Sequence, residues 1–435
     1  MTSALGVALA PAEREVLAAK PTANLSAYDA YLRGNAAEAP DFTVGAERIV
    51  NGWRTAVEHF REAIRLDSNF AIAYARLGGA LIGLSSFQID PVQNARAAQV
   101  AISRALSLAP TLSEAHVAQA LYQVWIAHDP ARGLVELEQA RTARPNDADL
   151  LVMIADYEWY LRGPEGRSIP FAERAVTLDP VSNSKALVLA RIYRDAGRYD
   201  EAERIYDKVI ARDPGSHGPY VMRAFLYLLR DGDTTRAKAS IRAAAARVDS
   251  IALIKAAVST MGIGTWASLG MLDESLQRTL LRFQADAFGD DTALYGLVKG
   301  YAYRARGLPR QSRAYFDSAE VVAEKRSRAF PADPNPLWVL MWTKAVHGRA
   351  DEAYHAFEQT WKQSGFTYMP ERSAVLARIA LFAGDTSRAL TELEKREWSY
   401  DLSLPWLCTD RFWDPLRPLL RFRQLVAGKC APPAR

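Results

Sequence analysis

Few residues of this sequence have the types and spacing that chemistry requires, and the first candidate is the glycine-rich run MGIGTWASLG at 261–270. A phosphate-binding loop needs such glycines after a strand, together with a lysine that reaches the phosphates. This run has no preceding strand pattern and no G-K-[ST], and the kinase signatures are absent from the chain. We therefore expect a loose turn of a degenerate helical unit here.

The sequence also gives no sign of a metal site or of a catalytic nucleophile. A zinc site needs several convergent histidine, cysteine or carboxylate ligands, but the six histidines are scattered and no H-E-x-x-H occurs. The two cysteines, Cys408 and Cys430, could bridge across a terminal hairpin, although two free buried thiols are favoured. We expect no catalytic residue, no metal and no cofactor, and we interpret the chain as a binding protein rather than an enzyme.

Any binding site must be positioned by the regular elements of the chain. Four regularly spaced prolines show how these elements are organised. They close the tripeptides Leu108-Ala109-Pro110, Ala143-Arg144-Pro145, Leu178-Asp179-Pro180 and Arg212-Asp213-Pro214, and lie 35, 35 and 34 residues apart. Each follows an amphipathic stretch. Because proline lacks an amide hydrogen and disfavours helical geometry in the residue before it, each is expected to end a helix.

Six hexapeptides that begin with glycine and end with alanine or serine form a second marker. Glycine supplies the left-handed backbone that ends one helix, and a polar residue after it can cap the next helix. The small residue at the end lets the second helix approach the first. The hexapeptides are GRYDEA (197–202), GDTTRA (232–237), GMLDES (270–275), GLPRQS (307–312), GRADEA (348–353) and GDTSRA (384–389).

The two markers together predict a helix–turn–helix unit of about 34 residues. The unit is most complete at 183–214, where Gly197 marks the turn. Its two helices should bury one face each, formed by Ala186, Leu189, Ala190 and Tyr193 and by Ala202, Tyr206 and Val209. The predicted fold is all-α, a right-handed α-α superhelical solenoid of about ten such repeats.

This spacing resembles the tetratricopeptide repeat (TPR). We expect residues 1–23 to form a lead-in helix, 24–395 the TPR-like solenoid, and 396–435 a C-terminal capping segment. The cap should cover the apolar face of the last repeat with its tryptophans and leucines. The resemblance implies a protein–protein interaction scaffold, or a regulatory or sensor module, that binds a peptide or protein in its concave groove.

Both ends of the chain carry a narrower resemblance. The segments KPTANLSAYDAYLRGN (20–35) and HFREAIRLDSNFAIAYARLG (59–78), with CTDRFWDPLRPLLRF (408–422), look like the TPR region of bacterial multidomain signalling proteins. In those proteins the region follows a Ser/Thr kinase, a nucleotide cyclase or a winged-helix domain, often with a TolB-like module between. None of the catalytic modules is here, so no catalytic residue is carried over. The resemblance implies that Met1 lies inside what is elsewhere a longer chain.

In tetratricopeptide numbering, certain positions of each first helix point into the groove. Aromatic residues and methionine there would give adaptable apolar contact, and arginine would grip carboxylates. A peptide with apolar anchors and an acidic group would suit this surface, although each residue could instead pack against a neighbouring repeat. The predicted groove residues are Trp125, Met153, Asp156, Trp159, Tyr160, Arg191, Arg194, Met222, Phe225, Tyr301, Arg304, Trp338 and Trp342.

Two other functions stay open at this level. A helical repeat of this length with an excess of arginine could bind RNA, but the positions that would read bases are aliphatic here. An enzyme on a helical-repeat scaffold would need a cluster of ionisable residues, and the sequence offers no motif that places one. The small net charge of +4 and the lack of a basic block give no sign of a nucleic-acid partner.

No membrane insertion is expected, because the longest uncharged stretch, 256–272, is too polar and too rich in glycine to cross a bilayer alone. The expected location is the cytoplasm. It becomes the periplasm or the membrane surface if a longer natural chain carries an upstream membrane span. The sequence does not give the identity of the partner or the oligomeric state.

Overall fold

In a computed structural model, the chain folds into two compact units. Unit 1 comprises Met1–Lys185 with Gly365–Tyr368, and unit 2 comprises Ala186–Ser364 with Met369–Arg435. The structure describes residues 21–38, 46–87, 89–163, 166–250, 252–254, 272, 274–288, 292–329, 331, 335–364, 372–395 and 402–428. Most of the predicted lead-in helix, the glycine run at 261–270 and Cys430 lie outside these ranges.

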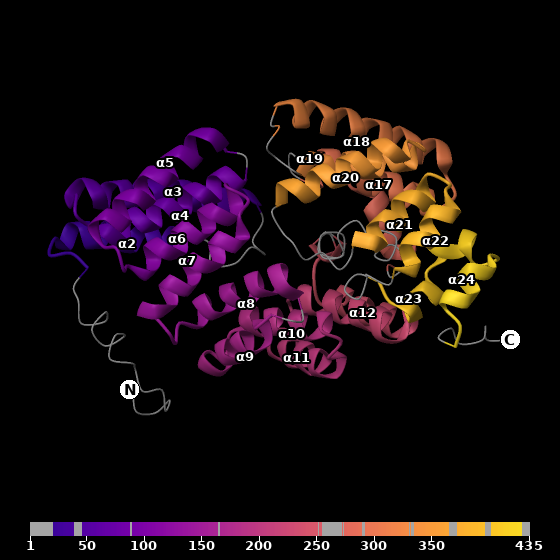
Figure 1. Cartoon of the computed structure of the whole chain (residues 1–435), viewed down its shortest axis with the longest axis horizontal. Coiled ribbons are helices and arrows are strands. Elements are labelled where there is room, and N and C mark those ends of the chain that lie inside the picture. The colour runs from indigo at the N-terminus through magenta and orange to yellow at the C-terminus, as the bar shows by residue number, and fades with distance from the viewer. Residues whose placement is uncertain are drawn as a thin grey trace. The chain divides into compact units, whose positions relative to one another are not determined.

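Every regular element in the described ranges is a helix, so the predicted all-α helical repeat is confirmed. Neighbouring helices of unit 1 pack in pairs, α2 with α3, α4 with α5, α6 with α7 and α8 with α9, as Figure 1 shows. The helices are α2 (Leu25–Ala37), α3 (Ala46–Leu66), α4 (Ala71–Ser86), α5 (Pro91–Leu108), α6 (Ser113–Trp125), α7 (Pro130–Ala143), α8 (Ala148–Arg162) and α9 (Ser168–Leu178).

Unit 2 continues the same pairing, with α12 on α13, α17 on α18, α19 on α20 and α21 on α22. Helix α10 begins at the end of unit 1 and runs into unit 2. The elements are α10 (Asn183–Asp195), α11 (Tyr199–Arg212), α12 (Gly218–Asp231), α13 (Thr234–Ala245), α16 (Glu274–Arg282), η3 (Ala285–Phe288), α17 (Thr292–Ala305), α18 (Pro309–Ala329), α19 (Asn335–Val346), α20 (Ala350–Ser364), α21 (Arg372–Phe382), α22 (Thr386–Glu394), α23 (Leu404–Thr409), η4 (Arg411–Leu416) and α24 (Leu420–Leu425).

The helices end where the sequence markers predict. Helices α5, α7, α9 and α11 each stop two residues before one of the four regularly spaced prolines. The turn glycines adopt a positive φ, which a residue with a Cβ atom adopts only with strain. The five in the described ranges are Gly197 (φ 76°), Gly232 (64°), Gly307 (69°), Gly348 (77°) and Gly384 (86°); Gly270 lies outside them.

The turn between α6 and α7 breaks this rule. His128 stands where these five turns have glycine, and its φ is 54°; Asp90, before α5, is the other described non-glycine residue with a positive φ. The next residue, Asp129, accepts a hydrogen bond from the backbone N–H of Arg132 and so caps α7. Asp233 and Asp385 cap α13 and α22 in the same way, after Gly232 and Gly384. This turn therefore has the same backbone conformation as the turns that contain glycine, and the left-handed position is occupied by a strained histidine.

The interior of the repeat at 183–214 matches its sequence prediction. The seven residues expected to line its two helices are each no more than 8% exposed, from Ala186 and Tyr193 at 8% to Ala190, Ala202 and Tyr206 at 0%. Small residues at the helix contacts let the backbones approach, and large aromatic rings fill the remaining space.

The C-terminal segment, described over 402–428, contacts two separate places in unit 2. Helix α24 and the short helix η4 lie against α22, and the guanidinium of Arg421 binds both carboxylate oxygens of Glu394 at 2.9 and 2.7 Å. Helix α23 instead packs against α12. This second contact was not expected of a simple end cap.

Two further sequence expectations concern the cysteines and the membrane. Cys408 is disulfide-bonded, so the expectation of two free thiols is wrong; the other cysteine, Cys430, lies outside the described residues. None of the helices in the described part of the chain is long and apolar enough to span a bilayer.

Candidate partner-binding surface

An exposed tryptophan marks the candidate surface in unit 1. Trp125 is the last residue of α6 and is 54% exposed. Val124, the residue before Trp125, packs with Tyr157 of α8, so the first helices of two successive pairs meet here. Met153, Asp156 and Tyr160 on α8 are half-buried. We call Trp125, Met153, Asp156 and Tyr160 the α6–α8 surface.

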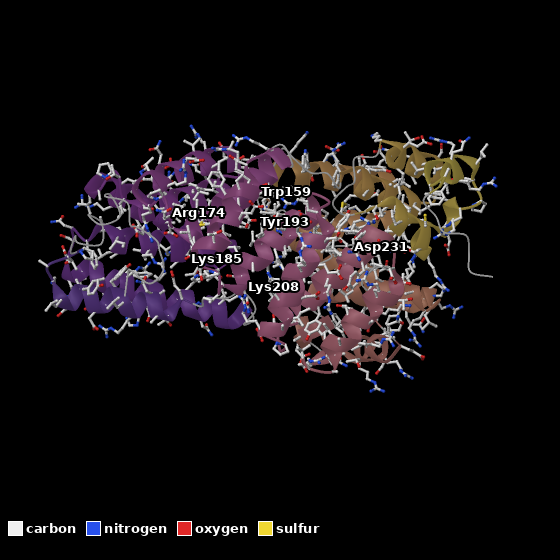
Figure 2. The ribbon with its side chains drawn as sticks, turned by 90° about the horizontal axis from the view of Figure 1, so that it is seen from below. Trp159, Arg174, Lys185, Tyr193, Lys208 and Asp231 are labelled. Carbon is white, nitrogen blue, oxygen red and sulfur yellow. The ribbon has the colours of Figure 1, made fainter. Side chains whose placement is uncertain are left out.

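Packing beneath this surface fixes it in place. Val124 of α6 and Tyr157 of α8 belong to one apolar cluster, which Met153 joins from its edge. The predicted groove residue Trp159, marked in Figure 2, is only 1% exposed and belongs to the packed interior. Sequence spacing alone does not distinguish Trp125 from Trp159, because both occupy groove positions of a first helix.

The two arginines predicted to grip a partner's carboxylate bind a carboxylate of their own chain. Asp195, at the end of α10, has a fully buried side chain, and its oxygens lie 2.5 Å from Arg194 Nη2 and 3.4 Å from Arg191 Nη1. Burial raises the pKa of Asp195 to about 6, against the opposing effect of Arg194 and Arg191. In this structure Arg194 is 4% exposed, so it does not reach a partner.

Arg194 also joins two further predicted groove residues into one cluster. Its guanidinium carbon lies 4.9 Å from the centre of the Phe225 ring, and its Nη1 lies 3.3 Å from the sulfur of Met222. The ring of Trp406, in α23, meets Phe225 edge-on with 5.5 Å between centroids. The C-terminal segment therefore covers part of α12 that the sequence assigned to a partner.

A second aromatic cluster gathers the predicted groove residues of α17 and α19. Tyr301 and Trp342, which are 0% and 1% exposed, lie 5.8 and 5.9 Å from Phe382 of α21. Arg304 stacks over the same ring at 5.1 Å, and Phe382 in turn meets Phe412 of η4 at 4.9 Å. The remaining predicted residue, Trp338, is half-buried on α19.

The structure thus places eleven of the thirteen predicted groove residues in three sets: the α6–α8 surface, the cluster around Arg194, and the cluster around Phe382. Trp159 and Trp338 belong to none of them. Sequence reasoning missed Phe382 and the aromatic residues of the C-terminal segment, which contact the last two sets. The dense aromatic pattern at 404–413 is the signal for these contacts in the sequence, although the pattern alone does not indicate which helices the segment contacts.

In the described part of the chain, no three side chains of histidine, cysteine, aspartate or glutamate are grouped so that they could hold a metal ion. A buried carboxylate, Glu158, is engaged by arginines instead. Its side chain is 0% exposed and contacts Arg162 and Arg167, with 3.0 Å to Arg167 Nη2. Burial alone would raise the pKa of Glu158, but these hydrogen bonds lower it below its usual value.

Comparison with known proteins agrees with this helix pairing. Residues 187–217 match the model of the tetratricopeptide repeat, and they cover most of α10 with all of α11. No curated protein shows significant similarity to the chain.

Several solved structures are similar to the chain. Yeast Tom70 is 15% identical over 86% of this chain and 66% of its own, with a TM-score of 0.40. A tetratricopeptide repeat protein from Parabacteroides merdae is 15% identical over 68% of this chain and 93% of its own, also at 0.40. YrrB, a TPR protein with an unusual peptide-binding site, is 20% identical over 43% of this chain and 91% of its own, at 0.33.

Proposed function

We propose, on the premise that the chain is built from helix pairs of the tetratricopeptide type, that it binds a peptide or protein partner on the α6–α8 surface. The single observation that carries the proposal is the exposure of Trp125, 54% of whose surface faces solvent. Tryptophan contributes more to binding than most residues when a partner covers it, because its large ring is then removed from water.

The neighbours of Trp125 suit the same role. Val124, the residue before Trp125, is packed in the apolar cluster with Tyr157, which fixes the backbone that presents the indole ring and lowers the entropy lost when a partner binds. Met153 can adapt its unbranched side chain to the shape of an apolar anchor. Asp156 and Tyr160 supply polar groups beside these apolar ones. An extended or helical peptide with at least one apolar anchor fits this set of side chains.

The resemblance of the chain ends to bacterial signalling proteins supports a more specific role. In this role the chain acts as a scaffold or as the regulatory or sensor module of a signalling protein, and the partner binds reversibly. In this proposal Arg191 and Arg194 stay paired with Asp195, and the α6–α8 surface binds its partner mainly through apolar contact.

A peptide library displayed on phage provides the test. Peptides are selected against the full-length protein, and their affinities are then measured for the Trp125→Ala variant. We expect affinity to fall at least tenfold, because a buried aromatic anchor typically contributes about 2 kcal/mol or more.

Val135→Ala is the matched control. Val135 lies on α7, the second helix of the same pair, and is 59% exposed, so this variant also removes an exposed apolar side chain. It should leave affinity unchanged. Equal affinity of the selected peptides for Trp125→Ala and the parent protein would rule out the proposed surface.

A further inference from the structure

A hollow of about 310 Å³ opens in unit 2 beside the turn between α17 and α18. Two arginines line it, Arg304 from the end of α17 and Arg313 from the first turns of α18. Its other walls include Phe316, Val346 and His347, so a charged rim stands beside an apolar wall. The volume is at the lower end of the range that small-molecule sites occupy.

Four arginines at this turn have no carboxylate partner in the described part of the chain. Arg304, Arg306, Arg310 and Arg313 lie within ten residues, and none of them forms an ion pair with a carboxylate in the described part of the chain. Arg230, by contrast, contacts three carboxylates of its own unit. Four cations this close in the sequence, none of them paired with a carboxylate, repel one another and favour a bound anion.

Arg304 is the most constrained of the four. One face of its guanidinium is covered by the ring of Phe382 at 5.1 Å, while the rest of the side chain is exposed. The covered face loses water, and this desolvation lowers the pKa of Arg304, with only the nearby Tyr301 opposing it. An anion beside Arg304 would restore the favourable interactions that the guanidinium has lost.

The carboxylates nearest to the hollow are already engaged. His347 lies between Asp317 and Glu320, with 3.0 Å from its ring nitrogens to each carboxylate. Glu320 also contacts Arg349 and Lys344. Glu320 is therefore neutralised by Arg349 and Lys344, whereas Asp317 is bound to His347 and, like Glu320, does not line the hollow itself.

We propose that this hollow binds a phosphate group, held between the guanidinium groups of Arg304 and Arg313. Arginine presents paired N–H donors that match the oxygens of a phosphate, and two such forks balance a doubly charged group. The hollow is larger than a phosphate ion alone, and the apolar wall at Val346 accommodates the organic residue that carries the group. The site lies in unit 2 and does not depend on the α6–α8 surface of unit 1.

Isothermal titration calorimetry of the full-length protein at low ionic strength tests this site. The probes are phosphoserine, inorganic phosphate and serine. We expect phosphoserine to bind with millimolar affinity and serine not to bind. Arg304→Ala and Arg313→Ala should each weaken phosphoserine binding at least tenfold. Arg304→Lys, which keeps the charge but loses the paired donors, should weaken it several-fold.

Arg306→Ala is the matched control, because it removes the same charge from the same turn but from a residue outside the wall of the hollow. It should change the affinity less than threefold. Tighter binding of phosphoserine than of inorganic phosphate indicates a group carried on an organic residue, and equal binding indicates the free ion; both support the site. Absence of phosphoserine binding, or equal effects of Arg306→Ala and Arg304→Ala, would overturn it.

Discussion

The ring of Trp406 meets the ring of Phe225 edge-on, with centroids 5.5 Å apart and an angle of 85° between the ring planes. This contact joins the C-terminal segment to α12, near the beginning of unit 2. The same segment binds α22 through Arg421 and Glu394, near the end of the unit. The segment therefore contacts two parts of unit 2 that are far apart in the sequence, in addition to covering the last helix pair.

Gly232→Ala should release α23 from α12. A Cβ atom at Gly232 would lie 2.4 Å from the carbonyl oxygen of Pro405, which is too close for any real contact. The positive φ of 64° adds backbone strain of about 1–2 kcal/mol. We expect the amide hydrogens of residues 404–409 to exchange at least tenfold faster in this variant, measured by mass spectrometry.

Gly384→Ala is the control that introduces the backbone strain of a positive φ without the steric contact that Gly232→Ala makes with Pro405. Gly384 begins the hexapeptide GDTSRA, which differs from the GDTTRA of Gly232 at one position, and its φ is 86°. No atom lies within 4 Å of a Cβ built there. This variant should lose about 1–2 kcal/mol of stability without faster exchange at 404–409. The same exchange rates in both variants would show that α23 does not depend on Gly232.

His128→Gly should stabilise the protein by about 0.5–1 kcal/mol. His128 occupies the left-handed position of its turn at φ 54°, where glycine adopts the conformation without strain. The gain is reduced by the greater freedom of glycine in the unfolded chain. Urea denaturation measures the change, and His128→Ala, which keeps a Cβ atom, should give no gain. A loss of stability in the glycine variant would show that the histidine side chain outweighs the backbone strain.

Asp195 should make stability depend on pH between about 4 and 6. Its pKa rises from an ordinary value near 3.8 to about 6 in the folded protein, mainly because of burial. The folded state then binds a proton at a pH where the unfolded state has released it. The contribution of Asp195 to the free energy of unfolding therefore increases as pH falls through 6 towards 4, by at most about 3 kcal/mol.

The Asp195→Asn variant lacks this titration, so the comparison isolates it. The free energy of unfolding of the parent protein minus that of the variant should rise between pH 7 and pH 4. A constant difference over this range would mean that Asp195 keeps an ordinary pKa, with its charge fully stabilised by Arg194 and Arg191.

Local rules explain how much of the fold the sequence predicted. Proline and glycine act on the backbone at their own positions, so the helix ends before Pro110, Pro145, Pro180 and Pro214 and the positive φ at five turn glycines followed from the residues alone. The fold class followed from the regular recurrence of these markers.

The candidate site was predicted less completely because exposure depends on tertiary contacts. Periodicity placed Trp125 and Trp159 on the same kind of helix face, but only packing decides that one is 54% and the other 1% exposed. The pairing of Arg194 with Asp195, its direct neighbour, depends on their joint burial, which no sequence motif signals. The approach of Trp406 to Phe225 depends on how the helix pairs of unit 2 stack.

The most direct test of partner binding at the α6–α8 surface is hydroxyl-radical footprinting of the full-length protein with and without a selected peptide. We predict that bound peptide lowers the oxidation rate of Trp125, Met153 and Tyr160 at least threefold, and leaves that of Phe171, on α9, unchanged. Unchanged oxidation of Trp125 at a peptide concentration that saturates the protein would contradict the account.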